Sequence, residues 1–142
     1  MKTIFFLFAI LTLFRPSFSQ QQSNPGEFLS SFVQGNYEII GRLPDSDTLY
    51  TGIAIIRGEK GQLQMVRTIN GQTINATARI ERAAIAETWV LRAQFSVNDV
   101  IYEAAYLIHS DLDNYARLSG YIYQEGKHTK KPGLEAWFIK LE

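Results

Sequence analysis

The chain of 142 residues contains no cysteine, so it has no disulfide, no thiol nucleophile and no thiolate metal ligand. It also lacks an excess of either charge, because 14 basic residues face 14 acidic ones. Neutralisation of phosphates supplies most of the affinity of nucleic-acid-binding proteins, and a chain near neutrality without a basic stripe is poorly suited to it. We therefore expect no nucleic-acid partner.

The N-terminus has the three parts of a secretory signal peptide. Lys2 supplies the positive charge, Ile4 to Phe14 form an apolar run, and small residues stand at Ser17 and Ser19 before a cleavage site. The run is shorter than the roughly 20 apolar residues that span a bilayer, so no stable membrane anchor is expected. We predict a signal peptide over 1–19 and a secreted or periplasmic protein.

The remaining chain has the length of one domain. Residues 20–26 are polar with Pro25 and predict a flexible leader, and residues 27–142 predict a single domain. Phe28, Leu29, Phe32 and Val33 form one apolar stripe of a short helix over Glu27 to Gln34, which ends at Gly35. A small exported domain without disulfides must rely on its apolar core alone.

After Gly35, β-rich runs alternate with turn residues. The clearest turn is Asn70-Gly71, because both central residues of a type I′ turn need positive φ. Eight runs joined by mostly short loops predict an all-β, antiparallel up-and-down barrel, since closure removes exposed sheet edges. The predicted strands are Tyr37–Leu43, Leu49–Arg57, Gln62–Ile69, Thr73–Glu81, Thr88–Phe95, Val100–Ile108, Tyr115–Tyr123 and Leu134–Leu141.

Apolar and polar residues alternate along these runs, which predicts one dry and one wet face. Tyr50, Gly52, Ala54 and Ile56 form one inward row, and Ile74, Ala76, Ala78 and Ile80 form another. Trp89, Leu91, Ala93 and Phe95 form a third. Small residues recur on these rows, as the interior of an eight-stranded barrel requires.

The order of a short helix, Gly35-Asn36-Tyr37 and eight meandering strands resembles the calycin superfamily, which includes the lipocalins, fatty-acid-binding proteins and avidins. Calycins open their first strand with Gly-X-Trp, and this chain departs from that pattern at Tyr37. The resemblance implies a small-ligand-binding barrel in which a late cation covers the first aromatic ring. Lys140 is the residue expected in that role.

The sequence shows no catalytic or metal-binding motif, and we expect neither catalytic residues nor a metal or cofactor. A Gly-X-Ser-X-Gly elbow is absent, and the His109, Asp111 and Asp113 group lacks the glycine of a calcium loop. Glutamates in the predicted strands, Glu135 among them, are interpreted as solvent-facing partners of strand arginines such as Arg67.

Aromatic residues are the better candidates for ligand binding. Tyrosines gather on two neighbouring strands with one guanidinium, a combination suited to orienting an apolar molecule with a polar head, although tyrosines are also good strand formers. The predicted ligand-binding residues are Tyr102, Tyr106, Tyr115, Arg117, Tyr121, Trp89 and Trp137.

Three classes of function remain open. The first is an exported barrel that binds a small apolar or amphipathic ligand without catalysis. The second is a protein-interaction or inhibitor module that binds a protein partner through loops or a tyrosine-rich face. The third is a small barrel enzyme of the cyclase or isomerase type, which would need a buried carboxylate beside a tyrosine hydroxyl in its cavity.

Overall fold

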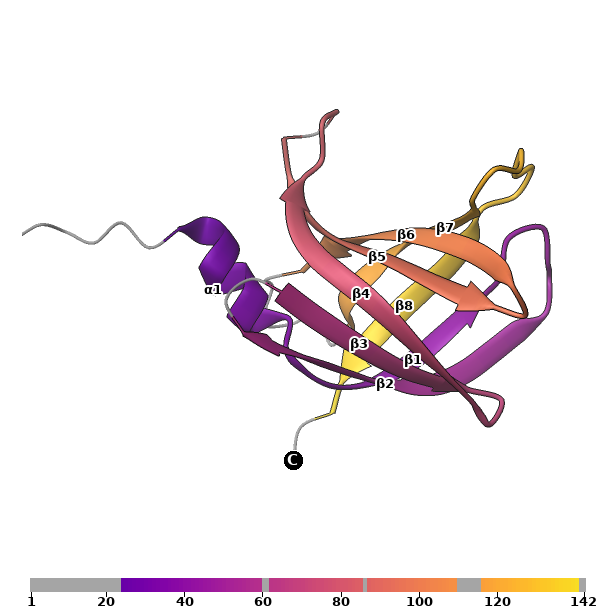
Figure 1. Ribbon diagram of the computed structural model, residues 1–142, viewed down its shortest axis with the longest axis horizontal. Helices are drawn as coiled ribbons and strands as arrows, with labels where there is room; N and C mark the ends of the chain where they lie inside the picture. Colours follow the sequence, from indigo (N-terminus) through magenta and orange to yellow (C-terminus); the bar gives the residue numbers. More distant parts are fainter. Residues whose placement is uncertain (1–23, 60–61, 86, 110–115, 141–142) are drawn as a thin grey trace, which may run out of the picture.

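The protein folds as one closed β-barrel with a short helix at one end (Figure 1). The computed structural model describes residues 24–59, 62–85, 87–109 and 116–140. The predicted signal peptide and most of the predicted leader lie outside the described residues. The elements are α1 (Pro25–Phe32), β1 (Gly35–Arg42), β2 (Leu49–Glu59), β3 (Gln62–Ile69), β4 (Gln72–Arg82), β5 (Trp89–Val97), β6 (Val100–Ile108), β7 (Ala116–Gln124) and β8 (Gly133–Ile139).

Each strand pairs antiparallel with its neighbours in the sequence, and β8 pairs with β1 to close the sheet. In this last pairing Tyr37 lies opposite Ile139 and Arg42 lies opposite Leu134. The prediction of an eight-stranded up-and-down barrel after a short helix is therefore confirmed. Closure leaves no strand edge of the barrel without a partner strand, which is what makes the architecture stable as a single sheet.

The barrel interior is filled by the inward rows that the alternation predicts. Along β4, for example, Ile74, Ala76 and Ala78 are buried while the residues between them are exposed. The same period of two recurs in β1 and β3, because successive side chains of a strand point to opposite faces. The core is thus a single cluster inside the barrel rather than a layer between two sheets.

Two hairpins close with two-residue turns of positive φ. Asn70 and Gly71 have φ angles of 51° and 78° between β3 and β4, and Asn98 and Asp99 have 50° and 62° between β5 and β6. These values are those of a type I′ turn, whose twist matches that of the flanking strands. The Asn70-Gly71 turn is confirmed where the sequence predicts it.

Helix α1 covers one end of the barrel, which we call the closed end (Figure 1). The helix begins after Asn24, whose side chain accepts a hydrogen bond from the backbone of Gly26, and Pro25 provides a preformed first turn. The Tyr37 hydroxyl donates a 2.7 Å hydrogen bond to the Val33 carbonyl, which ties the end of the helical segment to β1. Among the described residues, no helix is both long and apolar enough to cross a bilayer.

The expectation that Lys140 covers the Tyr37 ring is wrong. Tyr37 points into the barrel and is fully buried, whereas the Lys140 ammonium lies 3.3 Å from the Glu38 carboxylate on the outer face. Lys140 directly follows Ile139, which packs against the core, so alternation places the lysine outside. The cation that acts most strongly on Tyr37 is Arg117, whose guanidinium carbon lies 4.4 Å from the centroid of the Phe32 ring.

Candidate functional site

One row of residues crosses five strands and ends in a tyrosine on each side. Glu135 on β8 pairs with Gly120 on β7 and with Gly41 on β1. Beyond these glycines, Tyr106 lies opposite Gly120, and Tyr50 lies opposite Gly41. Because neither glycine carries a side chain, both tyrosines can lean across the intervening strand towards the same glutamate.

The contacts around Gly41 show why this position needs glycine. A Cβ atom placed on Gly41 would lie 2.6 Å from the Glu135 Cγ, 2.7 Å from the Leu134 carbonyl oxygen and 3.0 Å from the Tyr50 Cζ. These distances are shorter than van der Waals contact, and the Leu134 oxygen belongs to the backbone. A larger residue would therefore force β1 and β8 apart at the point where the two tyrosines meet the carboxylate.

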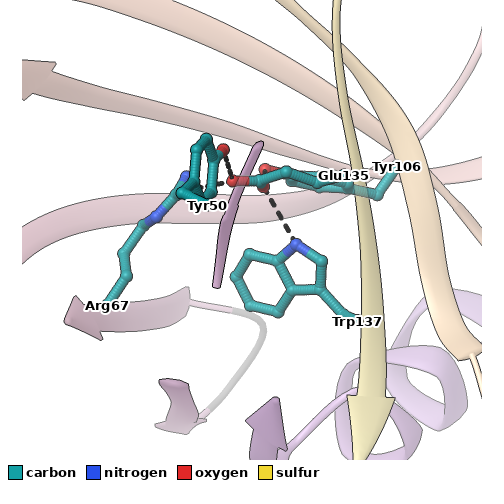
Figure 2. Close-up of polar contacts among 5 residues, drawn as sticks. All are labelled: Tyr50, Arg67, Tyr106, Glu135 and Trp137. Carbon is teal, nitrogen blue, oxygen red and sulfur yellow. Dashed lines mark hydrogen bonds and ion pairs between the residues drawn. The ribbon is translucent and has the colours of Figure 1, made fainter. Parts of the chain in front are cut away.

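The Glu135 carboxylate accepts hydrogen bonds from four side chains (Figure 2). The Tyr50 hydroxyl and the Arg67 Nη2 both donate to Oε1. The Tyr106 hydroxyl donates to Oε2 at 2.5 Å, and the Trp137 indole donates to the same oxygen at 2.9 Å. A buried carboxylate is costly unless it is paired and hydrogen-bonded, and here both oxygens are fully occupied.

Arg67 completes the cluster from β3. Its side chain is 1% exposed, its guanidinium carbon lies 4.2 Å from the centroid of the Phe95 ring, and it forms an ion pair with Glu135. The Nε and Nη1 atoms, however, are buried and have no hydrogen-bond partner within the part of the chain that the structure describes. A guanidinium carries five N–H bonds, and these two nitrogens account for three of them.

Burial and mutual contact determine the protonation of the cluster. Burial raises the pKa of Tyr50 well above its usual value, and the neighbouring Glu135 charge raises it further. Tyr106 is affected in the same way and by the same two causes. Burial is the largest single influence on Arg67 and opposes its charge, but Glu135, Tyr106 and Tyr50 together outweigh burial and hold the pKa of Arg67 above its ordinary range. Both tyrosines are therefore neutral donors at physiological pH, and Arg67 is a cation.

A cavity of about 230 Å³ lies directly over Arg67 and Tyr50, at the end of the barrel opposite α1. We call it the mouth cavity. The turn residues Asn70 and Asn98 stand at its rim, and its walls are mostly apolar. The apolar lining residues are Leu43, Ile69, Ile74, Phe95 and Val97. The arrangement is a small apolar pocket with a few polar groups at one point, which is the usual form of a small-molecule site.

Three of the residues predicted to bind a ligand lie at or near this site. Tyr106 and Trp137 are fully buried and hydrogen-bond Glu135, although they stand behind the cavity rather than in its wall. Tyr102 is partly buried and stacks on Phe95, with ring centroids 5.7 Å apart. These residues support the cavity and hold its polar floor in place.

The other predicted ligand-binding residues lie elsewhere. Arg117 is at the closed end, where its Nη1 donates a 3.2 Å hydrogen bond to the Phe32 carbonyl. Trp89 is also near the closed end, beside Gly26 of α1 and with Arg82 over its ring. Tyr121 is on the outer face and is 53% exposed. Tyr115, Asp111 and Asp113 lie outside the described residues.

Sequence reasoning missed the three residues at the centre of the site. The interpretation of Glu135 and Arg67 as solvent-facing is wrong, because both are buried. The signal that could have found them is alternation, since Arg67 shares a row with Leu63 and Met65, and Glu135 shares one with Trp137. The prediction that Tyr50 lies on an inward row is confirmed, since it packs against the core, but no local pattern in the sequence gives it a role.

Comparison with known proteins identifies no relative, because no family model, no curated protein and no solved structure matches the chain.

Proposed function

We propose that the protein is an exported barrel that binds a small apolar or amphipathic molecule in the mouth cavity, without catalysis. The observation that carries the proposal is that Arg67 lines that cavity while its buried Nε and Nη1 have no hydrogen-bond acceptor among the described residues. Leaving a buried donor without a partner costs about 1–3 kcal/mol, so such a group calls for a bound acceptor. The barrel architecture is consistent with the calycin resemblance, which implies the same function.

The dimensions of the cavity set the size of the ligand. Its volume of about 230 Å³ is smaller than the roughly 300–1,000 Å³ of sites for drug-sized molecules. A water molecule takes up roughly 30 Å³ in the liquid, so the cavity has the volume of about eight waters. A ligand that fits is therefore small, or it projects from the mouth between the hairpin turns.

The same cluster bears on the enzyme alternative, which requires a buried carboxylate beside a tyrosine hydroxyl. Glu135 and Tyr50 provide that pair, but four donors already occupy the carboxylate. The Tyr50 hydroxyl donates to Glu135, and its raised pKa keeps it protonated. A general base needs an accessible lone pair within reach of the substrate proton, so this cluster is better suited to orienting a ligand than to removing a proton.

One observation favours the interaction-module alternative. Exposed apolar side chains recur on the outer face of β7, β8, β1, β2 and β3, and two pairs of them are in register, because Leu134 lies opposite Tyr121 and Ile55 lies opposite Val66. The exposed members are Ile40, Leu49, Ile53, Ile55, Val66 and Leu134. Polar residues stand opposite the others, since Ile40 lies opposite Thr51 and Ile53 lies opposite Glu38, so the two apolar pairs are the surface that a protein partner would cover. The simplest protein partner is a second copy of this chain, and sedimentation equilibrium measures whether the protein self-associates. In the Ile53→Glu variant, this self-association should be lost.

The two tryptophans provide a direct test of ligand binding in the mouth cavity. Trp137 hydrogen-bonds the cluster beneath the cavity, and Trp89 lies near the closed end. In a ¹H–¹⁵N correlation spectrum, a ligand in the mouth should shift the Trp137 indole signal and leave the Trp89 signal in place. Native mass spectrometry of protein purified from its own source identifies a bound small molecule, which is then used in the titration.

A pair of variants controls this titration. Val97→Trp places a bulky ring at the wall of the cavity, whereas Val66→Trp makes the same change on the outer face. Binding should be lost in the first variant and retained in the second. A ligand that shifts only Trp89, or that binds Val97→Trp as tightly as the original protein, would refute the proposed site.

A further inference from the structure

The mouth cavity also carries information about the polar group of its ligand. An isolated arginine at the floor of the cavity would bind an anion. Whether Arg67 favours an anion or a neutral acceptor depends on the charges around its guanidinium and on the number of N–H donors it still offers.

The floor of the cavity has no net charge. The Arg67 cation and the Glu135 carboxylate are in contact, and their side chains are 1% and 0% exposed. Tyr50 and Tyr106 are neutral because burial raises the pKa of each. Arg67 is the one charged side chain among the described residues that line the cavity. Its positive charge is therefore already balanced, and no second cation is among the described lining residues to balance another anion.

A ligand carboxylate would meet two obstacles here. It would lose its hydration on entering an apolar cavity, which is expensive for an ion that finds no uncompensated partner. It would also share one guanidinium with Glu135, and two carboxylates held near one site disfavour each other's charge. The Coulomb attraction to Arg67 is largely cancelled by the repulsion from Glu135.

A neutral oxygen acceptor meets neither obstacle. The N–H bonds on Arg67 Nε and Nη1 have no acceptor among the described residues, and a carbonyl oxygen that reaches one of these nitrogens supplies lone pairs without bringing charge or a donor of its own. Hydrogen bonds from a charged donor are roughly twice as strong as those between neutral groups, so the contact remains favourable. The apolar lining, with Phe95 against the guanidinium face, suits a hydrocarbon body attached to that carbonyl.

Resting on the proposed function, we propose that the natural ligand is a small neutral carbonyl compound, such as a ketone or an ester, whose oxygen accepts hydrogen bonds from Arg67. Glu135 is the specificity-determining residue, because its charge makes the floor neutral and excludes carboxylates. Tyr50, Tyr106 and Trp137 act as positioning residues, because their hydrogen bonds hold the Glu135 carboxylate against Arg67.

The test compares 2-octanone with octanoate, which share a chain length and differ in the charge of the polar group. At pH 7.5 octanoate is ionised, since carboxyl pKa values lie near 4. Titration followed by the Trp137 indole signal should give a dissociation constant for 2-octanone at least tenfold lower than that for octanoate. Equal or tighter binding of octanoate at Trp137 would overturn the inference and leave the proposed function intact. If neither 2-octanone nor octanoate binds, both the inference about the ligand and the proposed function of the mouth cavity are overturned.

A variant provides the second arm. Glu135→Gln removes the compensating charge and keeps an oxygen acceptor for Arg67, so the floor becomes cationic. Octanoate affinity should rise at least tenfold in this variant, and the preference should reverse. An unchanged preference in the folded variant would overturn the role of Glu135. If thermal denaturation shows that Glu135→Gln does not fold, the comparison of the two probes on the original protein decides alone.

Discussion

Tyr50 on β2 and Tyr106 on β6 donate hydrogen bonds to the Glu135 carboxylate from opposite sides of β8. Each is separated from Glu135 by one strand, and each crosses that strand at a glycine. The two glycines therefore allow both tyrosine hydroxyls to reach the Glu135 carboxylate and hold it inside the core. The hydrogen bonds of this cluster depend on the glycines as much as on the polar side chains.

Gly41→Ala should destabilise the barrel, because the new methyl group would press on the Leu134 carbonyl and on Glu135. Overpacking of this kind typically costs about 1–3 kcal/mol in the free energy of unfolding. Gly26→Ala is the matched control, since a Cβ there meets its nearest neighbour at an ordinary 3.4 Å and alanine favours a helix. Urea denaturation of both variants measures the difference, and equal stabilities would contradict the account of Gly41.

The Arg67 and Glu135 pair should show strong coupling in a double-mutant cycle. Arg67→Met leaves a buried carboxylate without its cation, and Glu135→Gln leaves a buried cation without its carboxylate. Each single change should cost about 3–5 kcal/mol, because breaking a buried pair leaves an uncompensated charge. The double variant should be clearly more stable than the sum of the two losses predicts. Additive losses would show that the two charges do not compensate each other.

Stability should fall at alkaline pH through Tyr37. Burial raises the pKa of Tyr37 to about 12, despite the opposing influence of Arg117. The unfolded chain loses the phenolic proton near pH 10 and the folded protein loses it near 12. The contribution of Tyr37 is thus complete below pH 10 and is lost as the pH rises towards 12. In Tyr37→Phe the free energy of unfolding should fall less steeply over this range, and an identical slope would refute the assignment.

Gly71→Val should weaken the hairpin between β3 and β4. Gly71 has a φ of 78°, in a region that a β-branched residue rarely adopts, so we expect a loss of about 1 kcal/mol or more. Asn70→Gly is the control, because glycine accepts the 51° at that position without strain. Thermal melting distinguishes the two, and a melting temperature for Gly71→Val equal to that of the unaltered protein would contradict the turn assignment.

The strands and their order could be predicted from the sequence because they depend on local patterns. Alternation and turn residues such as Asn70-Gly71 identify strands, and short loops make sequence neighbours spatial neighbours. The prediction for Lys140 failed because a resemblance outweighed alternation, which places Lys140 on the same outer face as Glu38.

The site was harder to predict, since it depends on contacts between residues that are remote in the chain. Charged strand residues are usually exposed, and this expectation concealed Arg67 and Glu135. Their burial becomes favourable only when β3 and β8 face each other across the interior, which no local window of sequence reveals. The glycine positions that admit Tyr50 and Tyr106 likewise acquire meaning only from the register of β1 and β7 against β8.

The pairing of β1 with β8 has a consequence for the order of events during synthesis. The last strand of the barrel both closes the sheet and brings Glu135 to Arg67. Until then, a growing chain holds an arginine that has no counter-ion and two strand edges that have no partner. Burying that arginine before its carboxylate arrives would be costly, so β1 to β7 alone should not form a closed, packed barrel. Closure and assembly of the polar cluster are then one cooperative step, and truncation within β8 should prevent folding of the whole barrel rather than of one edge.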